Sequence, residues 1–174
     1  MSVLGITVDD AQVKAMLGAL AQRAGNLAPV MREIGQTLKN DALANFKDQH
    51  APDGTPWQPL SMATKLARAH RLSGGKGIRT KKGAIRAGAQ RIISSARILL
   101  DTGVLHNSIT VQEVTPSSVT VGSRIAYAAI HQFGGKAGRG RKVTIPARPF
   151  IGMSKSAERD ILDAIGAHLA RASA

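Results

Sequence analysis

Apolar residues recur every three or four positions in three segments of the chain, a spacing that predicts amphipathic helices. These helices are expected over residues 9–24, 29–47 and 154–171. Pro29 suits the first turn of the second helix, because a proline there loses no helical hydrogen bond. The three apolar stripes should face a hydrophobic core. They consist of Val13, Met16, Leu17 and Leu20; of Val30, Ile34, Leu38, Ala42 and Phe46; and of Ile161, Leu162, Ile165 and Leu169.

The pattern changes to alternation in the second half of the chain, which predicts β-strands. Residues 108–114 and 118–122 alternate on either side of a Thr-Pro-Ser turn, so they should form a hairpin. A third strand is expected at 143–145 and one helical turn at 126–132. Together with the helices, these strands predict an α+β fold, with a small, mainly antiparallel sheet on which N-terminal and C-terminal helices pack.

The length of 174 residues suits a single domain spanning 1–174, with room for an extended arm. The chain has no cysteine, which excludes disulfides and thiolate metal sites. Residues 1–10 lack the basic start and apolar core of a signal peptide. No apolar run approaches the roughly 20 residues that a membrane span needs, so a soluble protein without a membrane partner is expected.

Positive charge is concentrated in the middle of the chain, which carries +13 overall. Residues 54–100 contain ten basic residues and no Asp or Glu. The rest of the chain contains 14 basic and 11 acidic residues, a net charge of +3. Such a segment should stay extended unless an anionic surface neutralises it. Contact with DNA phosphates, contact with an acidic protein surface and a solvated loop are all open interpretations. The absence of aromatic residues among the basic ones argues against base stacking.

This basic segment is expected to form a long loop or arm at about residues 65–97. Ser61 can cap a short helix over 62–69. Residues 70–88 are rich in Gly, Lys, Arg, Ser and Thr, and an irregular segment of this length is usually functional or disordered. Residues 90–100 regain apolar character, and their spacing fits either a helix or a buried strand.

A second glycine-rich basic loop covers residues 134–140. It lacks the Gly-Lys-Ser/Thr ending that a nucleotide-binding loop needs to reach magnesium. It is therefore expected to be a mobile hairpin tip that is either solvated or in contact with nucleic acid or an acidic neighbouring protein. The candidate contact residues of the two basic segments are Lys76, Arg79, Lys81, Lys82, Arg86, Lys136, Arg139, Arg141 and Lys142.

No set of residues predicts catalysis or a bound cofactor. The five histidines lack the spacing of a zinc site with a carboxylate. Asp53 and Asp101 precede Gly or Thr-Gly, where an Asp caps a turn. Ser108 and Ser123 have no glycine elbow. His131 is expected to fix a turn through hydrogen bonds rather than to act in catalysis. A non-enzymatic protein without metal or cofactor is expected.

Two stiff segments end in an aromatic residue. Residues 52–57 form a Pro-Asp-Gly-Thr-Pro-Trp turn, and Trp57, the only tryptophan, is expected to fill a core edge rather than to bind a ligand. In residues 145–150, two prolines fix the backbone on either side of Arg148. The pattern leaves open whether Phe150 packs within the subunit or across a subunit boundary.

Four motifs occur in a fixed order along residues 46–152. They are a PDG-x-PW turn at 52–57, an L-x-x-TG-x-L-x-x-S-I segment at 99–109, a GS-x-x-x-YA-x-IHQ-x-GG segment at 122–135 and an IPARPF-x-G segment at 145–152. In this order they resemble the phage virion-morphogenesis or tail-completion family of Mu-like and P2-like phages. The motif residues with an expected structural role are Trp57, Tyr127, His131, Arg148 and Phe150.

The resemblance implies a structural protein of the virion neck or tail end, which completes the tail or joins head to tail late in assembly. It implies a cyclic homo-oligomer, a hexamer or a dodecamer, in contact with other phage neck and tail proteins and, in one arrangement, with phage DNA in the channel. The protein would lie in the virion, and in the host cytoplasm during assembly. In the family, segment 145–150 closes the sheet before the last helix.

The alternative function is that of a stand-alone protein that binds nucleic acid without sequence preference. Its support is the charge of the acid-free segment. Against it, the sequence lacks the signature of a helix-turn-helix, a zinc finger or an RNA-binding domain.

Overall fold

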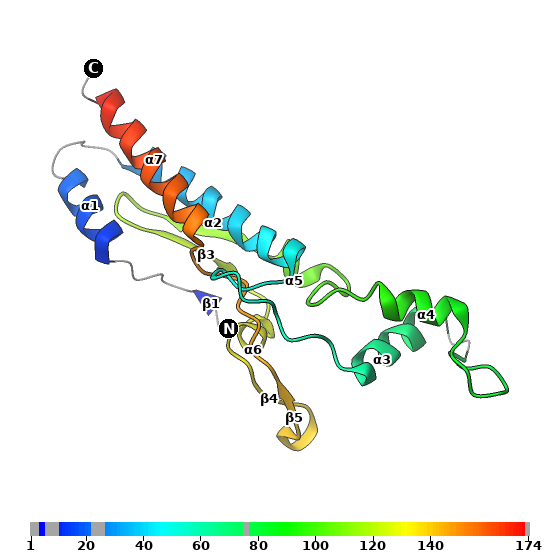
Figure 1. The fold of residues 1–174 in the computed structure, drawn as a ribbon. Helices are drawn as coiled ribbons and strands as arrows, with labels where there is room; N and C mark the ends of the chain where they lie inside the picture. The colour runs from blue at the N-terminus through cyan, green and yellow to red at the C-terminus, as the bar shows by residue number, and fades with distance from the viewer. Residues whose placement is uncertain (1–3, 6–10, 22–26, 75–76, 173–174) are drawn as a thin grey trace.

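The structure is a computed structural model that describes residues 4–5, 11–21, 27–74 and 77–172. It shows a body of helices and a small sheet, from which two narrow elements project (Figure 1). Among the described residues, no helix has the length and hydropathy of a membrane span. The α+β class predicted from the sequence is confirmed.

Helices from both ends of the chain pack together in the body. α2 (Ala28–Asp48) and α7 (Lys155–Ala172) lie side by side, and α1 (Ala11–Ala21) adds Leu17 to their shared core (Figure 1). All three helices predicted from apolar spacing are confirmed; α2 and α7 differ from the predicted bounds by one residue at each end, and residues 9–10 and 22–24 of the first predicted helix lie outside the described residues. The buried residues between α2 and α7 are Leu27, Val30, Met31, Ile34, Ile161, Ala164 and Ile165.

The main sheet has three antiparallel strands in the order β1-β3-β2. β2 (Thr110–Val114) and β3 (Val119–Ser123) form the predicted hairpin. Its turn is held by Thr115, whose hydroxyl accepts the backbone N–H of Ser118 at 2.9 Å. β1 (Leu4–Gly5) pairs with β3 at the other side, and the sequence does not predict it because two residues carry no periodic pattern.

The hairpin packs on α2 at a glycine. A Cβ atom on Gly35 would lie 2.7 Å from a methyl carbon of Val119 and 3.1 Å from one of Val111. Only a residue without a side chain therefore allows this close approach of helix and sheet. The sheet packs on one side of α2, and α7 packs on another side of it, so the body is built in layers (Figure 1).

A separate two-stranded ribbon projects from the body (Figure 1). β4 (Gly135–Ala137) pairs with β5 (Val143–Ile145), and a 3-10 turn, η1 (Arg139–Arg141), lies at its tip. The third predicted strand and the predicted hairpin tip are thus present, but they are not part of the main sheet. The expectation that segment 145–150 closes that sheet is wrong, because the described partner of β5 is β4 and the third strand beside β3 is β1.

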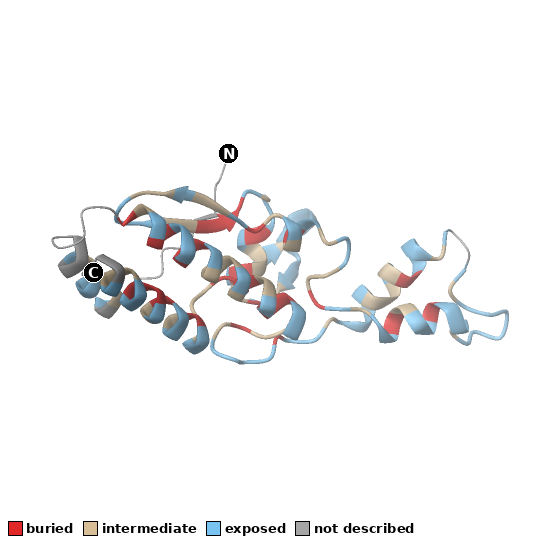
Figure 2. Cartoon of the chain, turned by 90° about the horizontal axis from the view of Figure 1, so that it is seen from above, coloured by how far each residue is buried: buried red, intermediate tan, exposed pale blue. Residues whose placement is uncertain are grey.

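The second projection is a helical hairpin, defined here as the arm (residues 62–94; Figures 1 and 2). α3 (Met62–Leu72) begins after Ser61, whose hydroxyl accepts the N–H of Thr64 at 3.2 Å, so the predicted cap is confirmed. α4 (Ala87–Ser94) packs on α3 to complete the hairpin.

The arm has a small hydrophobic core of its own. Ala69, Ala89 and Ile93 are buried where α3 and α4 meet, and Figure 2 shows buried residues on both helices. The expectation of an irregular loop over 70–88 is therefore wrong at both ends, because few but well-placed apolar residues fold the segment into helices. Residues 90–100 begin as helix, which decides against the buried strand.

A third cluster fills the body around three aromatic residues. Phe46 has its ring centroid 5.8 Å from that of Trp57 and 5.1 Å from that of Phe150. The short helices α5 (Val104–Asn107) and α6 (Ala128–Phe133) each add a buried residue to this cluster. Phe150 is fully buried, so it packs within the subunit.

Candidate functional site

The turn at residues 49–57 brings Trp57 into the core. The Trp57 N–H donates to the Gln49 carbonyl oxygen at 3.0 Å, which closes the base of the turn. The indole Nε1 donates to the carbonyl oxygen of Pro149 at 2.8 Å. The first and last motifs of the resemblance therefore meet in space, and Trp57 lies in the core with its polar atom satisfied.

Two buried amide side chains hold the segment 148–151 in place. Gln132 accepts the N–H groups of Phe150 and Ile151 at 2.9 and 3.1 Å and donates to the Ile151 carbonyl oxygen at 2.8 Å. Asn45 donates to the Phe150 carbonyl oxygen at 3.3 Å. Sequence reasoning missed both amides, although a polar residue beside a buried aromatic on a helix is the signal that could have found Asn45. Satisfied buried networks of this kind fix the local geometry.

The remaining motif residues meet in an open cleft of about 550 Å³ at the base of the arm, defined here as the motif cleft. One wall consists of the start of α3 and the residues before it. A second wall comes from residues 99–105, and a third from α6, β5 and Arg148. Three of the four motifs thus contribute to one cleft, which is the candidate site for binding a partner.

Arg148 is the most deeply buried charge of the motif cleft, with 6% of its surface exposed. Its Nε donates to the Gln58 carbonyl oxygen at 3.0 Å, and its Nη2 lies 3.5 Å from that of Pro59. No carboxylate of the described residues forms an ion pair with it. Burial lowers the pKa of Arg148, and the nearby charge of Arg68 lowers it further. The guanidinium is therefore a buried cation without a counter-ion.

His131 lies beside Arg148 in the same cleft. Its carbonyl oxygen accepts the Arg148 N–H at 2.7 Å, and its ring stands edge-on to Tyr127 with centroids 5.9 Å apart. The ring Nδ1 is buried and has no hydrogen-bond partner. Burial lowers the pKa of His131, and the charge of Arg148 lowers it further, so the neutral ring is favoured. The carbonyl oxygen of His131 holds segment 145–150 beside α6, and its ring Nδ1 makes no hydrogen bond, so the ring is not seen to fix a turn.

The rim of the motif cleft is apolar. Val104, Tyr127 and Val143 line the cleft and expose 48%, 44% and 56% of their surface. Phe133, the last residue of the helix that follows Tyr127, is 65% exposed. Clustered exposed apolar residues around a few polar groups are typical of a surface that binds another protein.

Asp101 ties the arm to the body at the edge of the motif cleft. Its Oδ1 accepts a 2.5 Å hydrogen bond from Nη2 of Arg71 and lies 3.5 Å from Nε of Arg68. Arg68 also donates to the Arg97 carbonyl oxygen at 2.7 Å, and the Arg97 side chain donates to the carbonyl oxygen of Lys47 on α2. Part of the positive charge in the acid-free segment is therefore used within the subunit.

The basic residues at the tip of the arm lie on the loop between α3 and α4. Arg79 and Arg86 are exposed, but both also bond to carbonyl oxygens of the loop itself. Lys81 and Lys82 are exposed and make no hydrogen bond or ion pair with the described chain. Lys76 lies outside the described residues.

The second basic set lies on the ribbon. Lys136, Arg139, Arg141 and Lys142 are all exposed. The ribbon and the arm project in different directions from the body, so the structure does not bring the two basic sets together (Figure 1). Each subunit therefore presents two separate basic surfaces.

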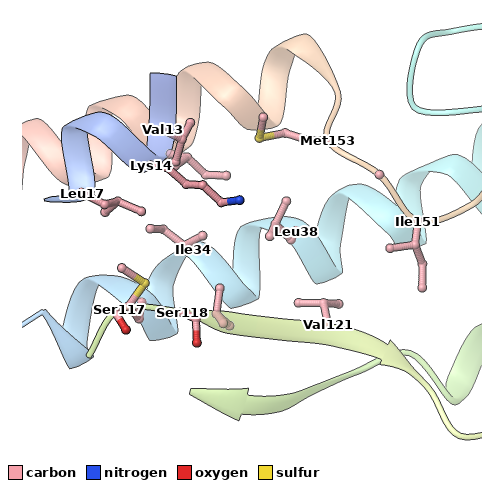
Figure 3. Close-up of a pocket in the computed structure, with 14 residues that line it drawn as sticks. Val13, Lys14, Leu17, Ile34, Leu38, Ser117, Ser118, Val121, Ile151 and Met153 are labelled. Atoms are coloured by element: carbon pink, nitrogen blue, oxygen red, sulfur yellow. The ribbon is translucent and has the colours of Figure 1, made fainter. Parts of the chain in front are cut away.

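An apolar cavity of about 150 Å³ lies under α1, between α2, α7 and β3 (Figure 3). Val13 and Leu17 face Ile34 and Leu38 across it, and Val121 borders it from the sheet. Its lining is mostly aliphatic, so it belongs to the packing of α1 on the body. Within the described ranges, no group of three or more His, Asp or Glu residues could hold a metal ion.

Comparison with known proteins agrees with the motif order. The sequence model of the phage virion morphogenesis family matches residues 8–170, nearly the whole chain. The chain belongs to the phage virion morphogenesis family. The resemblance based on four motifs is thereby confirmed, and the motif cleft is a feature of a virion morphogenesis protein.

The chain is similar in sequence to two named phage or prophage proteins. The chain is 37% identical over 164 residues to Mu-like prophage FluMu G protein 2 of Haemophilus influenzae, with 94% of each chain covered. It is 42% identical over 69 residues to the putative capsid assembly protein G of Escherichia phage Mu, which covers 39% of this chain and 44% of that protein. No solved structure matches this chain. A structural role in phage assembly follows from the family.

Proposed function

We propose that this virion morphogenesis protein is a non-enzymatic structural component of the virion neck or tail end, where it completes the tail or joins head to tail. The observation that carries the proposal is the presence, on one chain, of an apolar-rimmed cleft and two separate basic projections. Surfaces of these two kinds suit binding to other proteins and to polyanions.

In this proposal the subunits form a cyclic ring, a hexamer or a dodecamer. A ring closes only when one surface of a subunit meets a different surface of the next. The molecule is elongated, with the arm at one end and the C-terminal part of α7 at the other, so unlike surfaces are far apart on it (Figures 1 and 2). That arrangement supports a contact from head to tail.

The basic tip of the arm meets an acidic surface of a neighbouring neck protein in this proposal, and phage DNA in the channel is the other anionic candidate. The arm carries no aromatic residue on which a base could stack. The protein works in the virion after assembly in the host cytoplasm.

A clean deletion in a phage that carries this protein tests the proposed function. Electron microscopy should show heads and tails that do not join, or tails with abnormal ends. Expression of the chain from a plasmid should restore normal particles. Normal infectious particles from the deletion would contradict the proposal.

The alternative is a stand-alone protein that binds nucleic acid, and the exposed lysines of the arm tip are the observation in its favour. Quantitative mass spectrometry of purified virions separates the two functions. A ring component should be present at a fixed copy number per particle, whereas a stand-alone DNA-binding protein should be lost on purification.

A further inference from the structure

The buried guanidinium of Arg148 is the starting observation. The ion pairs of Arg68 and Arg71 go to the single carboxylate of Asp101, and Arg148 has no such partner among the described residues. A buried charge without a counter-ion is unfavourable unless something else compensates it. The two carbonyl oxygens that Arg148 faces are bonded through Nε and Nη2, so Nη1 makes no hydrogen bond with the described chain.

A second unused group lies in the same cleft. The Nδ1 atom of His131 is buried without a hydrogen-bond partner, and His131 adjoins Arg148 through its carbonyl oxygen. Buried polar atoms of side chains normally have partners, so an isolated one calls for an explanation. The guanidinium Nη1 is a donor whatever the state of the ring, so the cleft offers a cationic donor to a ligand that accepts hydrogen bonds.

We propose that the motif cleft binds the carboxylate of an Asp or Glu side chain of a second virion protein, with Arg148 as the main contact and the apolar rim holding the residues that flank it. The planar fork of an arginine matches a carboxylate, which can accept two parallel hydrogen bonds from it. That the second protein belongs to the virion rests on the function proposed above; recognition of a carboxylate rests on the cleft alone.

The lining of the cleft favours a protein carboxylate over a DNA phosphate. Val104, Tyr127 and Val143 offer apolar surface that suits the aliphatic neighbours of an acidic side chain. A DNA backbone would bring a row of negative charges past Asp101, which lines the same cleft and is exposed. A single carboxylate within an apolar segment brings one negative charge instead of a row, so it meets less of that repulsion.

The charge of the chain argues against a second copy as the occupant. Each copy carries +13, so a second copy would present a mostly positive surface to the cationic Arg148. The exposed acidic side chains of the described residues are scattered along the chain and no two are adjacent: Glu33, Asp48, Asp53, Asp101, Glu113, Asp160 and Asp163. An acidic segment of a different protein fits the cleft better, and ring contacts between copies would use other surfaces.

Binding of a carboxylate should be linked to a proton. The charged groups that share the cleft with His131 are Arg148, Arg68 and Asp101, and the ring of Tyr127 packs on it. Burial and the charge of Arg148 both lower the pKa of His131 in the free protein. A bound carboxylate would neutralise the second effect, so the pKa of His131 should rise on binding.

The test is a titration of the full chain with two matched peptides, followed by NMR. The probe is acetyl-Leu-Glu-Leu-amide and its control is acetyl-Leu-Gln-Leu-amide. The Glu peptide should bind about tenfold more tightly, because hydrogen bonds to a charged acceptor are stronger than those to a neutral one. The chemical-shift changes that the Glu peptide causes in the protein should be largest at Tyr127, His131 and Val143. Equal binding of the two peptides, shifts elsewhere, or no binding overturns the proposal.

Replacing Arg148 itself, for example by Lys, would also disturb its hydrogen bonds to the backbone of residues 58–59 and could affect folding. The test therefore uses variants at exposed positions on the rim of the cleft. The exposed rim variants Val104→Ser and Val143→Ser leave the core intact and should lower the affinity for the Glu peptide several-fold. The control is Met16→Ser, an exposed apolar residue on α1, which should bind as the parent chain does.

Two further measurements distinguish the other occupants. If duplex DNA displaces the Glu peptide from Tyr127 and Val143, the cleft is a DNA site and the proposal is wrong. Sedimentation tests for a second copy. If the chain forms an oligomer and the Val143→Ser variant is monomeric, the occupant of the cleft is a second copy and the proposal is again wrong. Failure of the peptide titration leaves the deletion phenotype untouched, so the proposed function and this inference fail separately.

Discussion

The indole Nε1 of Trp57 donates a 2.8 Å hydrogen bond to the carbonyl oxygen of Pro149, which lies 92 residues further along the chain. This bond joins the turn after α2 to the segment that leads into α7. Phe46 packs edge-on against the indole and also touches Phe150, so the same cluster secures both ends of the contact. The position of Arg148 in the motif cleft therefore depends on residues far from it in sequence.

Replacing Trp57 with Phe should test this bond. The substitution keeps an aromatic ring but removes the donor, and the unpaired carbonyl of Pro149 should lower the free energy of unfolding by about 1–3 kcal/mol. Urea denaturation followed by circular dichroism measures the change. Met62→Ala, an exposed apolar position on α3, is the control and should stay within about 0.5 kcal/mol of the parent. Equal effects of the two variants would contradict the assignment.

Gly134 should tolerate no side chain. Its backbone has φ 74° and ψ 179°, and a Cβ atom would lie 2.8 Å from the backbone nitrogen of Ala147. Gly54 also has a positive φ, of 84°, but open space around its Cβ position. Gly54→Ala should therefore lower stability by about 1–2 kcal/mol through backbone strain alone, and Gly134→Ala by clearly more, because it adds a clash with backbone. Thermal unfolding of both variants provides the comparison.

The sequence predicts those elements whose residues repeat regularly. α2 and α7 follow from apolar stripes, and the β2–β3 hairpin follows from alternation around a turn. Only residues 70–88 of the arm were expected to be irregular. The helical ends of this segment are hard to predict, because the core of the arm consists of Ala69, Ala89 and Ile93, and alanine gives little apolar signal among charged residues. The strand β1 is too short for any pattern.

The motif cleft could not be derived from sequence spacing. It joins segments near Ser61, Asp101, Tyr127 and Arg148, and their proximity depends on tertiary packing. The motifs did indicate which segments matter, since Tyr127, His131 and Arg148 come from them. Gln132 and Asn45 carry the hydrogen bonds that position Arg148's neighbours, and their partners are backbone groups that a sequence does not show.

Loss of the Asp101 carboxylate should loosen the arm without unfolding the protein. Asp101→Asn removes the charge that pairs with Arg68 and Arg71, and exposed ion pairs contribute only about 0–1 kcal/mol to stability. Hydrogen exchange should become faster in the second half of α3 and around residue 97, while the unfolding temperature changes little. The control is Asp53→Asn in an exposed turn, which should leave exchange in the arm unchanged. Unchanged exchange in both variants would mean that Asp101 does not hold the arm.

The stability of the fold should depend on pH through His131. The pKa of His131 in the folded protein lies below its usual value of 6.5, chiefly because the ring is buried. The unfolded chain therefore binds a proton at a higher pH than the folded chain does, so stability is fully present above about pH 6.5 and falls as the pH drops towards the folded pKa. His131→Gln should remove this part of the pH dependence in urea titrations. His70→Gln, at an exposed site on α3, should retain it.

Binding of the arm tip to DNA should be detectable through its salt dependence. If Lys81 and Lys82 contact phosphates, the logarithm of the affinity for duplex DNA should fall with the logarithm of salt concentration, by about 0.9 per phosphate neutralised. Replacing both lysines with Ser should then reduce the slope by about 1.8 without any change in sequence preference. The matched pair is Lys136→Ser with Lys142→Ser on the ribbon, which changes the charge equally on the other projection. An equal loss from both pairs would indicate attraction by net charge alone. A variant of the arm tip that keeps its DNA affinity but blocks particle assembly would identify an acidic protein as the partner of the arm.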